Sequence, residues 1–120
     1  MTFKTLVIVF LLAFWAIGAQ AQSLVKTETF RIEGNCEMCQ DRIEEALAFQ
    51  KGVKSARWNP ESKLATVVYR TDKTTVLQLK QAAMAAGHDT DAGKAADAVY
   101  QALPDCCQFR TKACKESSSK

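Results

Sequence analysis

Cys36 and Cys39 are the residues of this chain that are best suited to chemistry, because two thiols three positions apart can act together. Thiolate sulfur selects soft ions such as Cu(I), Zn(II) and Hg(II), whereas Mg(II) and Ca(II) prefer oxygen ligands. A C-x-x-C pair can also cycle between dithiol and disulfide. The pair therefore indicates either soft-metal binding or redox chemistry.

The segments that flank the pair place both thiols at the start of a helix. Alternating side chains predict a strand over 27–33, and apolar residues at helical spacing predict a helix from about 38 to 50, which Gly52 ends. Backbone N–H groups and the helix dipole at such an N-terminus favour anionic sulfur and lower a thiol pKa.

The remaining elements follow in an order that defines a fold. Two further strands, 53–58 and 63–70, are joined by a turn at 59–62, and a second helix begins after Thr74 or Thr75. Strand, helix, strand, strand, helix is the order of a ferredoxin-like β-α-β-β-α-β sandwich if one more strand follows.

The last strand is the weakest part of this prediction. The segment 88–91 is short and polar where that strand should begin, and 94–103 has helical spacing up to Pro104. We therefore predict an α+β fold, a ferredoxin-like sandwich with a short or degenerate last strand and an extra C-terminal helix.

The first 21 residues have the pattern of an export signal. A basic start and an apolar run over 6–17 precede Ala19-Gln20-Ala21, an A-x-A cleavage site. We expect the mature chain to begin near Gln22, to have no stable membrane anchor and to be periplasmic or secreted. The expected divisions are a signal peptide (1–21), a metal-binding domain (22–92) and a C-terminal helix with a cysteine-containing tail (93–120).

The charge pattern does not indicate a nucleic-acid partner. The chain has 16 basic and 13 acidic residues, which are interleaved, and the sequence has no basic run with stacking aromatic residues.

A second group of cysteines, Cys106, Cys107 and Cys114, follows the extra helix. Adjacent cysteines seldom bond to each other, so each needs another role. One of them can pair with Cys114, the helix can fold back and deliver thiols to the metal loop, or the thiols can remain free or link two chains. The sequence leaves these alternatives open.

Residues 27–90 resemble the heavy-metal-associated domain family, which includes small copper chaperones. The resemblance rests on C-x-x-C between strand and helix, the following Arg-Ile-Glu-Glu-Ala-Leu, the run Gly52-Val53-Lys54-Ser55-Ala56, and Ala86-Gly87. It implies a non-enzymatic protein that binds Cu(I) between Cys36 and Cys39 and passes it to a metal-transporting or metal-accepting protein. Zinc or mercury on the same site is an alternative, as is a dithiol oxidoreductase, although no proline resembles the cis-proline that faces the thiols in thioredoxin-like proteins.

The chain departs from the family pattern at two places. Its loop reads Gly34-Asn35-Cys36 where the family usually has Gly-Met-x-Cys, and His88 replaces a common aromatic residue. Because the family places that second loop beside the metal loop, His88 is a candidate third ligand or hydrogen-bond donor to a ligand, or else a surface histidine. Met38, between the two cysteines, can donate a thioether or point outward.

Overall fold

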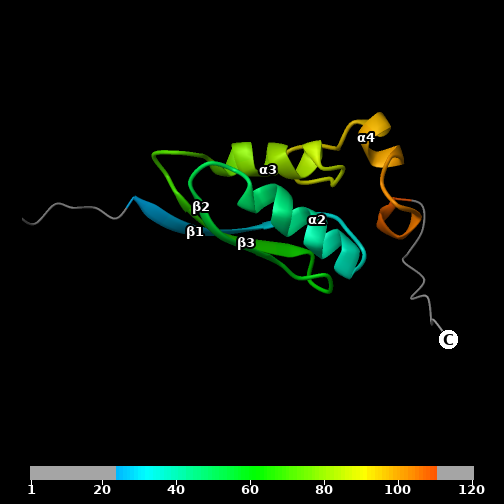
Figure 1. Ribbon diagram of the computed structural model, residues 1–120, viewed down its shortest axis with the longest axis horizontal. Coiled ribbons are helices and arrows are strands. Elements are labelled where there is room, and N and C mark those ends of the chain that lie inside the picture. The colour runs from blue at the N-terminus through cyan, green and yellow to red at the C-terminus, as the bar shows by residue number, and fades with distance from the viewer. Residues whose placement is uncertain (1–23, 111–120) are drawn as a thin grey trace, which may run out of the picture.

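A three-stranded antiparallel sheet carries two helices on one side in the computed structural model, which describes residues 24–110 (Figure 1). The strands lie in the order β1-β3-β2, so the third strand is central. The strands are β1 (Val25–Arg31), β2 (Val53–Trp58) and β3 (Leu64–Arg70), and the helices are α2 (Glu37–Ala48), α3 (Val76–Ala85) and α4 (Asp97–Gln101).

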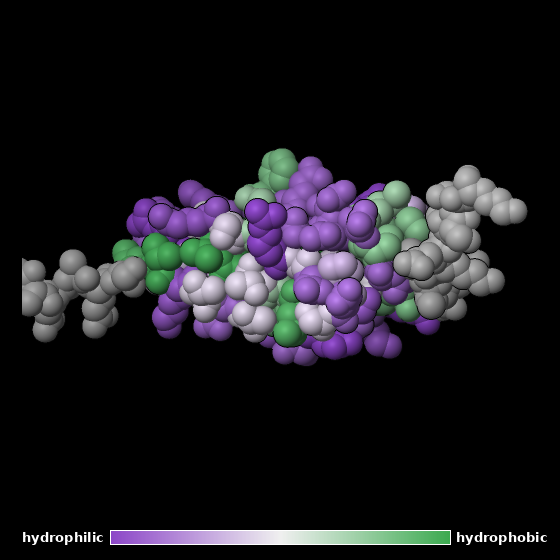
Figure 2. Space-filling model, turned by 90° about the horizontal axis from the view of Figure 1, so that it is seen from below, coloured by the Kyte–Doolittle hydropathy of each residue, from purple (hydrophilic) through white to green (hydrophobic). Residues whose placement is uncertain are grey.

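Alternation along β3 builds the inner face of the sheet. Ala65, Val67 and Tyr69 are buried, while the intervening Thr66 is exposed. Helix residues at spacing of three and four cover this face, and the fully buried ones are Cys39, Ile43, Leu47, Leu79 and Ala83. Figure 2 shows one face of the molecule, which is mostly hydrophilic with small separate groups of hydrophobic side chains.

Turn and cap residues set the element boundaries. The Asn59 side chain accepts hydrogen bonds from the backbone N–H groups of Glu61 and Ser62, which closes the turn before β3. Thr75 begins α3 in a capping box with Gln78, so the second of the two predicted cap residues is the one used.

The predicted fold class is confirmed, and the last strand is reduced to a single bridge. Within residues 24–110, Ile32 and Thr90 form an isolated antiparallel bridge at the free edge of β1. The Glu33 N–H also donates to the Asp89 carbonyl at 2.8 Å. Pairing stops there because the backbone N–H and carbonyl of Thr90 bond to Gly93, which turns the chain away from the sheet. The Asp89 carboxylate accepts the Ala95 N–H at 2.8 Å and holds this turn.

The extra C-terminal helix is shorter than predicted. It runs over Asp97–Gln101 and not over 94–103, because Ala95 is held by Asp89 and Ala96 has the extended backbone of an N-cap. A 3-10 turn, η2 (Asp105–Cys107), follows.

The C-terminal segment, which runs from Ala95 through α4 and η2 to Arg110, packs into the core of the sandwich. Tyr100, Leu103 and Cys107 are buried in one hydrophobic cluster with the sheet and helix residues. Gly87 has a φ of +103°, and a Cβ there would lie 2.9 Å from the Leu103 side chain, so glycine is needed where the segment packs. Within the described residues, none of the helices has the length and apolarity required to cross a lipid bilayer.

Candidate metal centre

Cys36 and Cys39 lie where the loop after β1 enters α2. Cys36 is the N-cap residue, with extended backbone, and Cys39 is in the first helical turn. Their sulfur atoms are 3.8 Å apart, well beyond the ~2.05 Å of a disulfide bond. The pair thus converges at a helix N-terminus as a dithiol, which is the geometry that the sequence predicts.

The loop that carries the thiols is fixed against Trp58. The Trp58 indole N–H donates to the Ile32 carbonyl at 3.0 Å, and Trp58 is only 2% exposed. A Cβ on Gly34 would lie 3.0 Å from the indole ring and 3.2 Å from the Cys39 Cβ, so this loop position has almost no room for a side chain. Lys63 also donates to the Gly34 carbonyl from the other side of the hairpin.

His88 is fully buried, so its interpretation as a surface histidine is wrong. Its Nδ1 lies 2.8 Å from the Glu33 carbonyl oxygen, and its ring stacks on Phe109 with centroids 5.8 Å apart. Among the described residues its Nε2 has no hydrogen-bond partner. His88 is outside the group of thiols described below. Its contacts position the metal loop through Glu33, while its role as a ligand remains a prediction.

Burial gives His88 a definite effect on stability. Burial, together with the positive charge of Arg42, lowers the pKa of His88 below 6.5, although the Glu33 hydrogen bond and Asp89 oppose this. The unfolded chain therefore takes up a proton at higher pH than the folded protein. We expect the contribution of His88 to the free energy of unfolding of the metal-free protein to be constant above pH 6.5, and to decrease as the pH drops from 6.5 through the folded-state pKa.

Urea unfolding of the reduced, metal-free protein at pH 7.5, 6.5 and 5.5 measures this effect. The control is His88→Gln, which cannot titrate and should show a flatter dependence over the same range. Equal slopes in the two proteins would contradict the assignment of the pH dependence to His88.

The second cysteine group lies against the first. The sulfur atoms of Cys36, Cys106 and Cys107 are all within 4.8 Å of one another, and those of Cys106 and Cys107 are 4.0 Å apart. The Cys36 thiol also approaches the Cys106 carbonyl oxygen at 3.7 Å. Of the alternatives left open by the sequence, the described residues show the arrangement in which the C-terminal segment folds back onto the metal loop. Cys114 lies outside the described residues.

The four thiols differ in their exposure to solvent. Cys36 and Cys106 are partly exposed, whereas Cys39 and Cys107 are fully buried. Burial, and then the neighbouring Cys39 and Cys106 thiols, raise the pKa of Cys107 strongly. Cys107 is therefore a protonated thiol at neutral pH in the metal-free protein.

Met38 points toward this cluster from the solvent side. It is 48% exposed, and its thioether sulfur lies 3.5 Å from the Cys106 sulfur. The sequence leaves two interpretations of Met38, a thioether ligand or an outward-pointing side chain. Its exposure agrees with the outward orientation, and its sulfur nevertheless lies beside the Cys106 thiol.

Arg110 anchors the C-terminal segment and was not identified from the sequence. Its guanidinium group donates two hydrogen bonds to the Asp89 carboxylate, at 2.6 and 2.9 Å, and one to the Ala95 carbonyl at 2.9 Å. It also lies 4.1 Å from the centre of the Tyr100 ring. No local periodicity marks such a residue, because its partners are up to 21 positions away.

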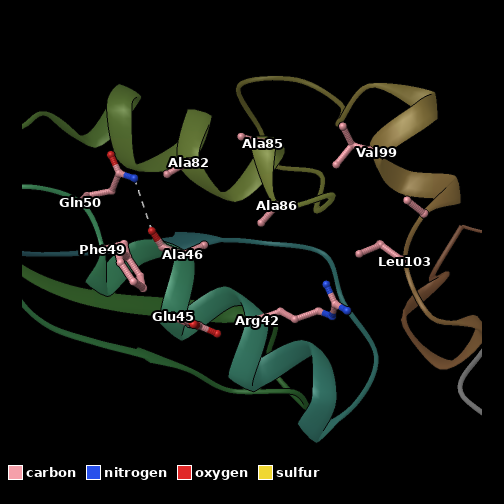
Figure 3. Close-up of a pocket in the computed structure, with 11 residues that line it drawn as sticks. Arg42, Glu45, Ala46, Phe49, Gln50, Ala82, Ala85, Ala86, Val99 and Leu103 are labelled. Atoms are coloured by element: carbon pink, nitrogen blue, oxygen red, sulfur yellow. Dashed lines mark hydrogen bonds between the residues drawn. The ribbon is translucent and has the colours of Figure 1, made fainter.

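A separate groove of about 550 Å³ lies between α2, α3 and the C-terminal segment (Figure 3). Its lining includes Ala82 and Ala85 of α3 and Ala86, which caps that helix. Phe49, Val99 and Leu103 also line it. None of the lining residues is a cysteine, so this groove is distinct from the thiol cluster.

Comparisons with known proteins identify the region that carries the C-x-x-C pair. The sequence model described as "Heavy-metal-associated domain" matches residues 29–89, about half of the chain. None of the curated proteins matches the chain in sequence.

Solved structures resemble the same region. The CopZ metallochaperone is 35% identical, with a TM-score of 0.53 over 54% of this chain and 98% of its own. The N-terminal domain of a potential copper-translocating P-type ATPase from Bacillus subtilis, solved in its Cu(I)-loaded state, is 33% identical, with a TM-score of 0.52 over 54% of this chain and 82% of its own. Oxidized MerP from Ralstonia metallidurans CH34 is 26% identical, with a TM-score of 0.53 over 56% and 94%.

Proposed function

Since this chain belongs to the heavy-metal-associated domain family, we propose that it binds Cu(I) through Cys36 and Cys39 and passes the ion to a partner protein. The observation that carries the proposal is the convergence of two thiols, 3.8 Å apart, at the N-terminus of α2. In this role the protein is a carrier of metal ions and not an enzyme.

Copper is our first choice because two kinds of observation agree. Thiolates favour the soft Cu(I) ion over hard divalent ions. Of the similar structures, one is the N-terminal domain of a potential copper-translocating ATPase in its Cu(I)-loaded state, and another is a metallochaperone. These resemblances support a metal-trafficking role at the same site.

The partner that we propose is a metal-transporting or metal-accepting protein with its own thiol ligands. The partly exposed Cys36 sulfur can be reached by an incoming thiol, whereas the buried Cys39 sulfur cannot. Exchange would therefore begin at Cys36 and proceed one ligand at a time. From the leader pattern we propose that this exchange takes place outside the cytoplasm, in the periplasm or after secretion.

Mercury is the second candidate cargo, because the thiolates of Cys36 and Cys39 also favour the soft Hg(II) ion. Zinc is a third, since the thiols of Cys106 and Cys107 lie near the Cys36 and Cys39 pair and Zn(II) forms closed tetrahedral sites with thiolates. A dithiol oxidoreductase would use the same cysteines without any ion.

Anaerobic titration of the reduced mature protein with Cu(I), Zn(II) and Hg(II), each against a competing chelator, tests the proposal. We expect Cu(I) to bind with a strength that withstands a Cu(I)-specific chelator, and oxidation of the pair to abolish binding. If the protein retains Hg(II) or Zn(II) but not Cu(I), the retained ion and not copper is the cargo. Catalytic turnover in an insulin-reduction assay, lost in Cys36→Ser, would instead favour the oxidoreductase.

A further inference from the structure

We propose that the C-terminal segment supplies additional ligands, so that thiolates of Cys106 and Cys107 join those of Cys36 and Cys39 around one bound ion. This inference rests on the proposed function and concerns how the same site is completed. It makes the segment an internal competitor for the ion against the partner protein.

The spacing of the sulfur atoms fits such a site. Four sulfur atoms at about 2.3 Å from a tetrahedral ion are about 3.8 Å apart. The sulfur-to-sulfur distances are 3.8 Å in the first pair and 4.0 Å in the second, and the Cys36 sulfur is within 4.8 Å of both tail sulfurs. The Cys39 sulfur lies outside this group of three, 3.8 Å from the Cys36 sulfur, so it would be the fourth ligand to join. Closure of the group of three by up to about 1 Å would bring Cys36, Cys106 and Cys107 to the spacing of ligands on one ion, with Cys39 beside them.

The segment is held in place without any metal. The Arg110 guanidinium forms a two-fold hydrogen-bonded pair with Asp89, and Phe109 stacks on His88 while meeting the Tyr100 ring edge-on at 5.2 Å. Gln108 donates to the Leu103 carbonyl at 3.2 Å, which fixes the turn that carries the cysteines. The 3-10 turn η2 itself contacts α2. The tail thiols are therefore positioned before an ion arrives, which reduces the entropy lost on binding.

Ligation by these thiols is an exchange of protons for metal. Each S–H bond that breaks releases its proton to solvent while a metal–sulfur bond forms, and neither sulfur nor metal changes oxidation state. A site that uses three or four thiols should therefore release more protons on binding than a site with two.

The cluster also suggests an order of release. Cys36 and Cys106 are the partly exposed pair, and Cys39 and Cys107 lie beneath them. An acceptor thiol would meet an ion whose outer ligands are Cys36 and Cys106, and it must displace Cys106 as well. Transfer should therefore be slower, and retention stronger, than at a site with only the first pair.

The test compares the reduced wild-type protein with Cys106→Ser, Cys107→Ala and the double variant, each loaded anaerobically with one equivalent of Cu(I). X-ray absorption counts the sulfur atoms around copper, and competition with a Cu(I) chelator measures retention. Asp105→Asn is the matched control, because Asp105 is an exposed residue of the same turn with no sulfur. Alanine at 107 keeps the buried site apolar, and Cys106→Ser changes a position that is not fully buried.

We expect at least three sulfur ligands in the wild type and in Asp105→Asn, two in the double variant, and a loss of retention of at least about tenfold, by analogy with the effect of ligand-supporting residues. Two sulfur ligands and equal retention in all five proteins would overturn the inference but leave the proposed function intact. Full retention by a protein lacking Cys36 and Cys39 would contradict the proposed function instead.

Discussion

Replacing Cys36 with serine and Cys39 with alanine is expected to weaken Cu(I) binding by at least about a thousandfold. A four-ligand zinc site in a small peptide contributes about 10–16 kcal/mol, so each thiolate contributes at least ~2 kcal/mol. Loss of two thiolates then removes at least ~4 kcal/mol, which is three orders of magnitude in the dissociation constant. Competition with a Cu(I) chelator under reducing conditions measures the change.

The choice of alanine at position 39 follows from its surroundings. Cys39 is fully buried against Gly34 and Trp58, so a serine hydroxyl there would lose its hydrogen bonds to water. The partly exposed Cys36 tolerates serine more readily. Circular dichroism of the double variant should match the wild type, which separates loss of ligands from loss of fold.

Glu37→Gln is a matched control for this pair of substitutions. It changes an exposed residue between the two cysteines and leaves all thiols in place. We expect its dissociation constant to stay within about threefold of the wild-type value, since surface charges contribute little. If the double variant keeps wild-type affinity, the first pair of thiols is not the binding site.

The sandwich could be predicted because its signals are local. Alternation along β3, the turn at Asn59, the cap at Thr75 and the helical spacing around Ile43 each depend on neighbours within a few residues. The structure confirms these elements, with α2 beginning at Glu37, one residue before the predicted start.

The C-terminal segment could be predicted only in part. The shortening of its helix depends on Asp89 holding Ala95, and its docking depends on Arg110 and Phe109 reaching residues of the second loop. Such contacts join segments that no periodicity connects. The sequence named the folded-back arrangement of Cys106 and Cys107 as one alternative among three, and only the three-dimensional contacts favour it.

Removing the Asp89 carboxylate is expected to detach the C-terminal segment from the domain. The Asp89 and Arg110 side chains are only 12% and 21% exposed, so Asp89→Ala leaves the guanidinium group with little solvent. Its remaining carboxylate contact is the exposed Asp97, at 3.3 Å. The substitution also leaves the Ala95 N–H without its acceptor. Breaking a buried ion pair costs about 3–5 kcal/mol, and we expect about 2–4 kcal/mol here because some water reaches Arg110.

Asp89→Asn is the matched variant, since an amide oxygen can still accept the Ala95 N–H while the charge is lost. Burial tends to raise the pKa of Asp89, but hydrogen bonds from Arg110 and Ala95 and the charge of Arg110 lower it below 3.8. The carboxylate therefore contributes its full stability above pH 3.8, and this is lost as the pH drops through the folded-state pKa. The asparagine variant should lose less stability than the alanine variant at pH 7.

Hydrogen exchange should show which part of the Asp89→Ala protein loses stability, because a segment can open without the whole domain unfolding. We expect the amides of Tyr100 and Cys107 to exchange faster by about 30-fold or more, while those of β3 change little. If the tail thiols ligate the ion, one equivalent of Cu(I) should restore much of this protection, since a ligand that binds only the docked state stabilises that state. Unchanged protection of these amides in the metal-free variant would show that the Asp89–Arg110 pair does not hold the segment in place.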